Sequence, residues 1–390
     1  MNRILSRLLG RLPIGWLQLT HNPMRFAAAL TGVGFANVLV FVQLGIMNSM
    51  ATATLRPYTF FSADVMISAA DANGLTDGGN VARQWLLQAM ADPDVADGTG
   101  LFIGNVPWDR PDVDISFTSF GVDPAKPGFI APEIAGDLPL LEVQDATLID
   151  RLARGLKGET ASAIRPQSPF LFETEGRTLT AYSTFAGGGG FGGDGYMMMS
   201  DQSFLSLFPA RRSSAPDHIL LRLRPGADVE TVLPRLRKII SDHGLRIRSY
   251  AQAGQEELSF QQTRRPTGII FGFGVLIGVL VGLVIVYQVL STDVADHLRE
   301  YATFKAMGYG QRFFMGIVLE EALILGVLGF VPGFAVGATI LTVMGKITTL
   351  PLAVTPSMAI TIFAGTVIFS VLSGAVATRR LAAADPADLF

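Results

Sequence analysis

Four long runs of apolar residues constrain this chain more than any other feature. Residues 26–55, 266–292, 322–345 and 347–378 contain no Asp, Glu, Lys or Arg and are rich in Leu, Val, Ile, Phe, Gly and Ala. Roughly 20 helical residues cross a hydrocarbon core about 30 Å thick, so each run is long enough to span a bilayer. A soluble protein can bury one such helix, but four runs indicate a polytopic α-helical membrane protein with four transmembrane helices. The third helix is expected to cover 313–345.

The composition disfavours several other classes of protein. The chain has no cysteine, and its four histidines (His21, His218, His243 and His297) lie far apart. It therefore offers no thiolate nucleophile and no spacing typical of a metal site. A formal net charge of −3 argues against nucleic-acid binding. We expect no catalytic residue, metal or cofactor in this chain.

The basic residues in the short connections predict how the four helices are oriented. Loops rich in Lys and Arg stay in the cytoplasm. Lys346 is the only base between the third and fourth helices, whereas nine bases lie on the other side: Arg3, Arg7, Arg11, Arg25, Arg299, Lys305, Arg312, Arg379 and Arg380. The amphipathic segment 1–25, the loop 293–312 and the tail 379–390 are then cytoplasmic, and residues 56–265 form a periplasmic domain.

The pattern between the first and second helices predicts an α+β domain. Its first part, about 60–106, and its last part, about 215–252, show the same order of strand, helix and strand, as two halves of one subdomain. They flank an insertion, about 107–214, that is rich in turn residues. The expected elements are Ala63–Ser68, Val81–Met90 and Gly100–Val106 in the first half, and His218–Leu223, Val229–Ile240 and Leu245–Tyr250 in the second.

The insertion contains a run of glycines, Gly187–Gly195. It is not a phosphate-binding loop, because no Lys-Ser or Lys-Thr ends it and no helix pattern follows. We interpret it as a flexible loop or hairpin tip, and Met197–Met199 after it as a packed strand. No GxxxxGK[ST] sequence occurs anywhere in the chain, so P-loop ATP hydrolysis would require a separate subunit.

The loop 293–312 carries the most specific sequence signal. It is polar and helix-prone, and reads DVADHLREYATFKAMGY from Asp293 to Tyr309. Two interpretations apply, a solvated helix beside the membrane or a coupling helix that docks into an ATPase. The second is favoured because the segment closely resembles the corresponding loop of DevC-type ABC-exporter permeases. More loosely it resembles the MacB/FtsX/LolC superfamily, in which an Arg-Glu pair precedes a basic residue, an apolar pair and Gly. The positions assigned to ATPase coupling are Asp293, Asp296, His297, Arg299, Glu300, Tyr301, Lys305, Met307, Gly308 and Tyr309.

Other stretches of the membrane part carry the same resemblance. Pro13–Thr20 (PIGWLQLT) and Phe41–Gly45 (FVQLG) resemble the start of DevC proteins, in which a cytoplasmic amphipathic helix leads into the first span. Leu319–Ala322 (LEEA) matches the third-helix pattern of the superfamily, and Asp385–Phe390 (DPADLF) resembles its terminal segment.

The resemblance implies a permease subunit of an ABC exporter in a bacterial inner membrane. Such a subunit moves a glycolipid or other amphiphile outward by mechanotransmission, without carrying it through a lumen. The implied partners are a DevA-like ABC ATPase that holds ATP and Mg, a DevB-like membrane-fusion adaptor, a TolC-like outer-membrane channel, a second permease copy and membrane lipids. Two alternatives stay open: an FtsX-like transmembrane regulator of a cell-wall hydrolase, and a LolC- or LolE-like lipoprotein-releasing permease.

Two acidic residues, Glu320 and Glu321, lie within the third span. Charged groups inside a membrane are costly and are often functional, for example as a proton relay. The other spans offer no Asp, His or Lys to build such a relay. We therefore favour a structural role near the cytoplasmic interface, in which both glutamates are hydrogen-bonded or paired with Arg or Lys.

Overall fold

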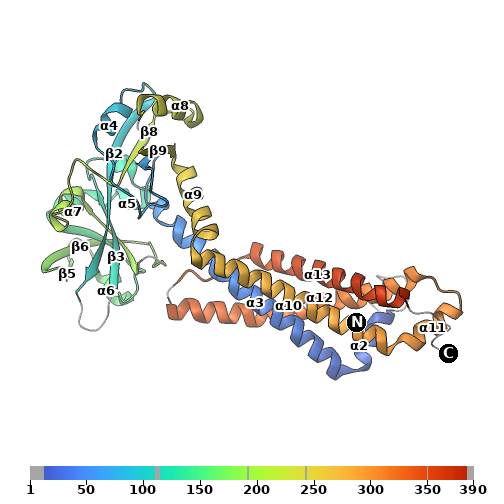
Figure 1. Cartoon of the computed structure of the whole chain (residues 1–390). Helices are drawn as coiled ribbons and strands as arrows, with labels where there is room; N and C mark the ends of the chain where they lie inside the picture. Colours follow the sequence, from blue (N-terminus) through green and yellow to red (C-terminus); the bar gives the residue numbers. More distant parts are fainter. Residues whose placement is uncertain (1–12, 110–114, 191–192, 242–243, 349, 384–390) are drawn as a thin grey trace. The chain divides into compact units, whose positions relative to one another are not determined.

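The computed structural model describes residues 13–109, 115–190, 193–241, 244–348 and 350–383, in two compact units (Figure 1). The membrane unit comprises Met1–Asn48, Pro266–Ile347 and Leu352–Phe390, and the outer unit comprises Ser49–Arg265 and Thr348–Pro351. Some predicted features lie outside the described residues, namely Arg3, Arg7, Arg11 and the segment Asp385–Phe390, and so do the side chains of Arg299, Arg379 and Arg380.

The membrane unit contains the four predicted spanning helices. Helices α3, α10, α12 and α13 are long and apolar enough to cross a membrane, which confirms the four-span architecture. The short helix α2 precedes the first of them, and α11 joins α10 to α12. The bounds are α2 Ile14–His21, α3 Pro23–Leu55, α10 Pro266–Asp296, α11 Leu298–Ala306, α12 Gln311–Thr348 and α13 Pro356–Ala383. The fourth span begins later than the predicted residue 347, at a proline, which suits the first turn of a helix.

Small residues bring the spanning helices close together. A Cβ atom added to Gly337 of α12 would lie 2.8 Å from Phe41 Cβ of α3, and one added to Gly329 would lie 2.6 Å from Val33 Cγ1. On the neighbouring face of α3, Val40 Cγ2 would lie 2.9 Å from a Cβ added to Gly278 of α10. Since lipid chains are as apolar as these side chains, close backbone packing at glycines is what holds such helices together.

In the outer unit, the two halves predicted from the sequence share one sheet. The first half is β1 Val65–Ala69, α4 Gln84–Ala89 and β2 Val95–Trp108, and the second is β8 His218–Leu223, α8 Val229–Ile239 and β9 Leu245–Ser249. Strand β1 pairs antiparallel with both β8 and β9, and β2 pairs antiparallel with β8. The spatial order β2-β8-β1-β9 is that of a split β-α-β pair, in which the strands of the two halves interleave.

The insertion extends this sheet instead of forming a separate layer. Its strands are β3 Ile115–Val122, β4 Ala146–Asp150, β5 Phe170–Thr174, β6 Arg177–Phe185 and β7 Gly195–Ser200, and the order across the nine-stranded sheet is β5-β6-β4-β7-β3-β2-β8-β1-β9. Strand β2 joins the two parts because its 14 residues pair with β8 at one end and with β3 at the other. Met197–Met199 are fully buried in β7, which confirms the packed strand.

Short helices complete the outer unit. They are η1 Pro57–Phe60, η2 Pro127–Phe129, α5 Pro132–Ala135, η3 Leu138–Glu142, α6 Gly158–Ala163, α7 Asp201–Leu207 and α9 Tyr250–Thr263. Helix α9 begins with a capping box, in which the Ser249 side chain accepts the backbone N–H of Gln252 while the Gln252 side chain accepts that of Ser249.

The described residues of the glycine run form a loop and not a hairpin tip. Strands β6 and β7 lie on opposite sides of β4, so the connection between them crosses over that strand. The backbone N–H groups of Gly187 and Gly188 donate to the Asp150 carboxylate at 2.8 and 2.6 Å. Gly188 has φ +89°, a conformation that favours glycine. Burial raises the pKa of Asp150, and these N–H donors oppose the rise.

Candidate functional site

Helix α11 lies at one end of the membrane unit, between the second and third spans (Figure 1). It has nine residues, with Glu300 in the first turn and Lys305 in the last, an arrangement that suits the helix dipole. A helix of this length is not stable alone in water, so tertiary contacts must hold it. The predicted loop 293–312 therefore consists of the last turn of α10, the helix α11, and the first residues of α12.

Tyr301 holds α11 against the bundle. Its side chain is only 2% exposed, and its ring packs edge-on against Phe314 of α12 with 5.6 Å between centroids. The hydroxyl donates to Gln18 Oε1 of α2 at 3.3 Å. Burial raises the pKa of Tyr301 far above its usual value, so the hydroxyl is a neutral donor. Tyr301 therefore ties three helices together and is not available to a partner.

Three further predicted residues fix the end of α10. Asp296 forms an ion pair with Arg25 of α3, and His297 Nδ1 lies 3.0 Å from the Asp293 carbonyl oxygen. Because Arg25 and Asp296 are both exposed, their ion pair contributes at most about 1 kcal/mol. These contacts set the direction in which the chain enters α11.

Gly308 ends α11 in a Schellman motif. Its φ of +92° places it in the left-handed region that favours glycine. The Gly308 N–H donates to the Lys305 carbonyl at 3.0 Å, and the Tyr309 N–H donates to the Phe304 carbonyl at 3.1 Å, which are the two bonds of the motif. The residues on either side of Gly308 are thereby held in a fixed turn.

The outward face of α11 and its turn combines charge with apolar surface. Met307 is 61% exposed and Tyr309 46% exposed, and Glu300 and Lys305 are exposed as well. The Phe313 ring packs against the Tyr309 ring, with 4.5 Å between the ring centroids. Methionine and aromatic residues are enriched in protein–protein interfaces. We call Glu300, Lys305, Met307 and Tyr309 the coupling face.

The predicted coupling residues therefore divide by position. Some hold α11 in place, namely Asp293, Asp296, His297 and Tyr301, whereas the coupling face points outward and Gly308 shapes the turn between them. The side chain of Arg299 lies outside the described part of the chain.

Glu320 and Glu321 lie under the N-terminal helix α2. The Trp16 N–H donates to Glu320 Oε1 at 3.3 Å, and a Cβ added to Gly15 would lie 2.9 Å from Glu321 Cγ, so α2 packs directly on α12. The buried Glu321 carboxyl group has the Asp293 carboxyl group as its neighbour, with no Arg or Lys bonded to it among the described side chains. The expected pairing with Arg or Lys is thus not seen for Glu321 in the described structure.

The outer unit contains a cavity of about 350 Å³ that is lined by both polar and apolar residues. Glu257 of α9 lines it, and its Oε2 accepts from the Tyr58 hydroxyl and the Leu75 N–H, each at 2.8 Å. The Leu75 carbonyl lies 2.8 Å from His218 Nε2, so the N–H and the carbonyl of Leu75 are both held by buried side chains. Burial raises the pKa of Glu257 and lowers that of His218, which favours the neutral form of each group. No local sequence pattern indicates this cluster, because its members are far apart in the chain.

One part of the chain is similar to a known protein family. Residues 268–386 match the family model of the FtsX-like permease C-terminal domain, a segment that contains the coupling face and most of three spans. No match was found among curated proteins.

Solved structures similar to this chain correspond to about half of it. The periplasmic region of MacB from Actinobacillus actinomycetemcomitans is 8% identical, with a TM-score of 0.35 over 50% of this chain and 93% of that one. The extracellular domain of the ABC-type transporter YknZ from Gram-positive bacteria is 7% identical, with a TM-score of 0.33 over 48% and 98%. A domain of a permease protein from Porphyromonas gingivalis is 16% identical, with a TM-score of 0.31 over 49% and 89%.

Proposed function

We propose that this chain, whose residues 268–386 match the FtsX-like permease C-terminal model, is the permease subunit of an ATP-driven exporter. The observation that carries the proposal is the coupling face. Its exposed Met307 and Tyr309 lie in a turn fixed by Gly308, on a helix that Tyr301 anchors to α12 and α2. A rigid outward face joined to spanning helices suits the transmission of a push from a partner into the membrane.

The proposed partner on this face is an ABC ATPase. The chain has no P-loop sequence, so ATP and Mg bind to the partner subunit. The bases Arg25, Lys305 and Arg312 lie at the α11 end of the membrane unit, and the positive-inside rule then assigns this end, with both termini, to the cytoplasm. The membrane is the bacterial inner membrane.

The outer unit is then proposed to lie in the periplasm. Closure of the ATPases would displace α11, and through it the spans that flank the outer unit in the sequence. The assembly would contain two permease copies, a membrane-fusion adaptor and a TolC-like channel, as in DevC-type exporters, and its cargo would be a glycolipid or another amphiphile. The mixed polar and apolar cavity beside Glu257 fits cargo of that class.

The test is an affinity purification of the solubilised full chain, with the bound proteins identified by mass spectrometry. We expect a P-loop ATPase and a membrane-fusion adaptor to be recovered together. Met307→Asp should lose the ATPase and keep the adaptor, because it puts a charge into the apolar part of the coupling face. The matched control is Leu87→Asp, since Leu87 is also exposed but lies on α4 of the outer unit.

Other outcomes would contradict the proposal. Recovery of an ATPase with a cell-wall hydrolase and without an adaptor would indicate the regulatory function instead. Retention of the ATPase by Met307→Asp would show that the coupling face does not bind it. Loss of the ATPase from Leu87→Asp as well would show that the effect is not specific to this face.

A further inference from the structure

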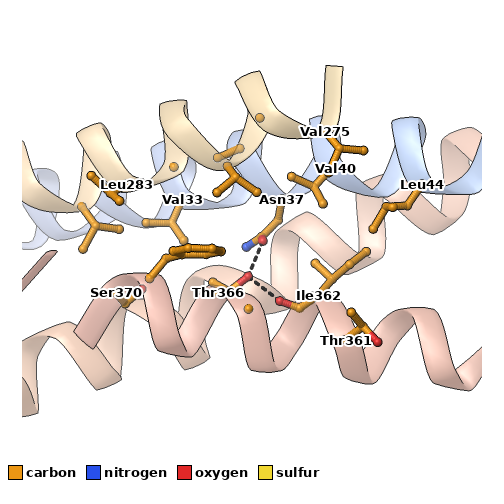
Figure 2. Close-up of a pocket in the computed structure, with 17 residues that line it drawn as sticks. Val33, Asn37, Val40, Leu44, Val275, Leu283, Thr361, Ile362, Thr366 and Ser370 are labelled. Atoms are coloured by element: carbon orange, nitrogen blue, oxygen red, sulfur yellow. Dashed lines mark hydrogen bonds between the residues drawn. The ribbon is translucent and has the colours of Figure 1, made fainter. Parts of the chain in front are cut away.

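A cavity of about 290 Å³ lies within the membrane unit, between helices α3, α10 and α13 (Figure 2). It has about twice the volume of a ~150 Å³ apolar cavity that binds benzene. Its wall is mostly aliphatic and glycine, and includes Val33, Val40, Leu44, Val275, Leu283 and Ile362. Such a wall accepts a hydrocarbon chain.

Four polar side chains interrupt this apolar wall, namely Asn37, Thr361, Thr366 and Ser370, and the last three lie on α13. Asn37 of α3 is 4% exposed, and Ser370 of α13 is 1% exposed. The Thr366 hydroxyl of α13 lies 2.6 Å from Asn37 Oδ1 and 2.8 Å from the Ile362 carbonyl oxygen (Figure 2). Asn37 Nδ2 and Ser370 Oγ have no hydrogen-bond partner among the described residues. Unbonded polar atoms are expensive in the apolar interior of a membrane protein, so these two require a partner.

The bonding at Thr366 shows which kind of partner fits. A hydroxyl has one hydrogen, so Thr366 donates to only one of its two neighbouring oxygens at a time. If the Asn37 amide turns by half a rotation, Nδ2 donates to Thr366 and Thr366 donates to Ile362, which leaves Oδ1 open instead. Either orientation leaves one Asn37 atom free, a donor in the first case and an acceptor in the second. A hydroxyl group serves both cases because it donates and accepts, and a ketone or ether serves only the first.

The depth of the site decides which part of a lipid reaches it. Asn37 is close to the middle of the 33-residue helix α3, and Ser370 is close to the middle of α13. The ends of these helices, not their middles, meet the head-group region of a bilayer. A head group or an ester carbonyl therefore does not reach Asn37, whereas a substituent in the middle of an alkyl chain does.

We propose that this cavity binds a hydroxylated alkyl chain of a lipid, with the chain hydroxyl bonded to Asn37 and Ser370. The aliphatic wall covers the methylene groups on both sides of that hydroxyl. The site goes beyond the proposed function, because this binding requires neither the ATPase nor export and is measured on the permease alone.

The experiment is competitive photolabelling of the full chain in lipid nanodiscs. The probe is a stearic acid with a mid-chain diazirine, and the labelled peptides are identified by mass spectrometry. The competitors are stearate and a mid-chain hydroxystearate at equal mole fractions. We expect labelling of α3 and α13, and about three- to tenfold stronger competition by the hydroxystearate, the range that one or two hydrogen bonds give within a membrane.

Three variants separate the hydrocarbon wall from the polar site. Gly365→Leu should abolish labelling by filling the cavity, since Gly365 lines it and an added Cβ would meet only Phe369, at 3.8 Å. Asn37→Leu should keep labelling but weaken the preference for the hydroxystearate, because only Ser370 then remains to bond the chain hydroxyl. Ser373→Ala is the matched control: Ser373 lies on the same helix but its hydroxyl already donates to the Leu283 carbonyl, so the preference should remain.

Equal competition by the two fatty acids in the unmodified protein would overturn the hydroxyl part of the proposal. Labelling that Gly365→Leu leaves unchanged would show that the chain binds on the outer surface of the helices and not in the cavity. Absence of labelling in α3 and α13 would leave only water as the partner of Asn37 and Ser370, and would overturn the whole proposal.

Discussion

Removing the Tyr301 ring should release α11 from the bundle. The ring is almost fully buried against Phe314, so Tyr301→Ala loses apolar burial and leaves a cavity, a change that costs about 3–5 kcal/mol for a large aromatic residue. Tyr301→Phe keeps the ring and loses only the bond to Gln18, which is worth about 0.5–1.5 kcal/mol. Because nine residues do not form a stable helix alone, the loss should appear as local opening of α11.

Hydrogen exchange of the backbone amides of α11 measures this opening directly. Each 1.4 kcal/mol lowers protection about tenfold, so Tyr301→Ala should reduce it by roughly two to three and a half orders of magnitude, and Tyr301→Phe by about tenfold or less. The Met307 amide, which donates to the Thr303 carbonyl, is a suitable reporter. If Tyr301→Ala leaves this protection unchanged, other contacts hold α11 and the anchoring role is wrong. An equal loss in both variants would assign the anchor to the hydrogen bond instead of the ring.

Three more predictions concern single residues. Glu300→Lys changes an exposed charge, so the free energy of unfolding, measured by thermal unfolding, should change by less than about 0.5 kcal/mol. Stimulation of the partner ATPase should nevertheless become uncoupled from transport. An equal loss of protein level and activity would instead show a folding defect. Gly308→Ala forces a left-handed conformation on a residue with a Cβ and should cost about 1–2 kcal/mol, seen as lower amide protection of the last turn of α11, whereas unchanged protection would contradict the Schellman ending. Burial raises the pKa of Glu257, so folding of the outer unit takes up a proton there. The contribution of Glu257 to stability is therefore fully present below the ordinary carboxyl pKa of about 4.3 and is lost as pH rises through the raised value. Glu257→Gln should reduce this loss, measured as amide exchange of Leu75 against pH, and an unchanged pH profile would show that Glu257 is not its source.

The four spans and the two β-α-β halves could be predicted because each has a strong local pattern. Length and hydropathy alone identify the run 266–292 as a spanning helix. The strand His218–Leu223 is a short, mostly aliphatic run, and all of its residues except Arg222 are buried in the sheet. The sheet strands of the insertion were less visible, because the turns between them dominate its composition. Nothing local indicates that β2 continues to Trp108 and pairs with β3 there.

The candidate site was predictable as a segment but not as a surface. The loop 293–312 was assigned to coupling as a whole, yet Tyr301 faces inward while Glu300 faces outward. This division depends on the contact of Tyr301 with Gln18, which is 283 residues away in the sequence. The hydrogen bond between Asn37 and Thr366 likewise joins two different helices, so the place of Asn37 in the cavity could not be predicted from its neighbours in the sequence. Pairings over such distances are set by packing and leave no local pattern.

The pairing of β1 with β9 has a consequence for how chains of this kind diversify. The first and last strands of the outer unit lie side by side, with Val65 opposite Ser249, and the Tyr250 N–H donates to the Asp64 carbonyl at 2.9 Å. A segment whose two ends meet at one place can be replaced as a complete cassette, because the incoming segment needs only the same spacing between its ends. Recombination can therefore exchange the segment from β1 to β9 of such a chain while the four spans and the coupling face are inherited unchanged.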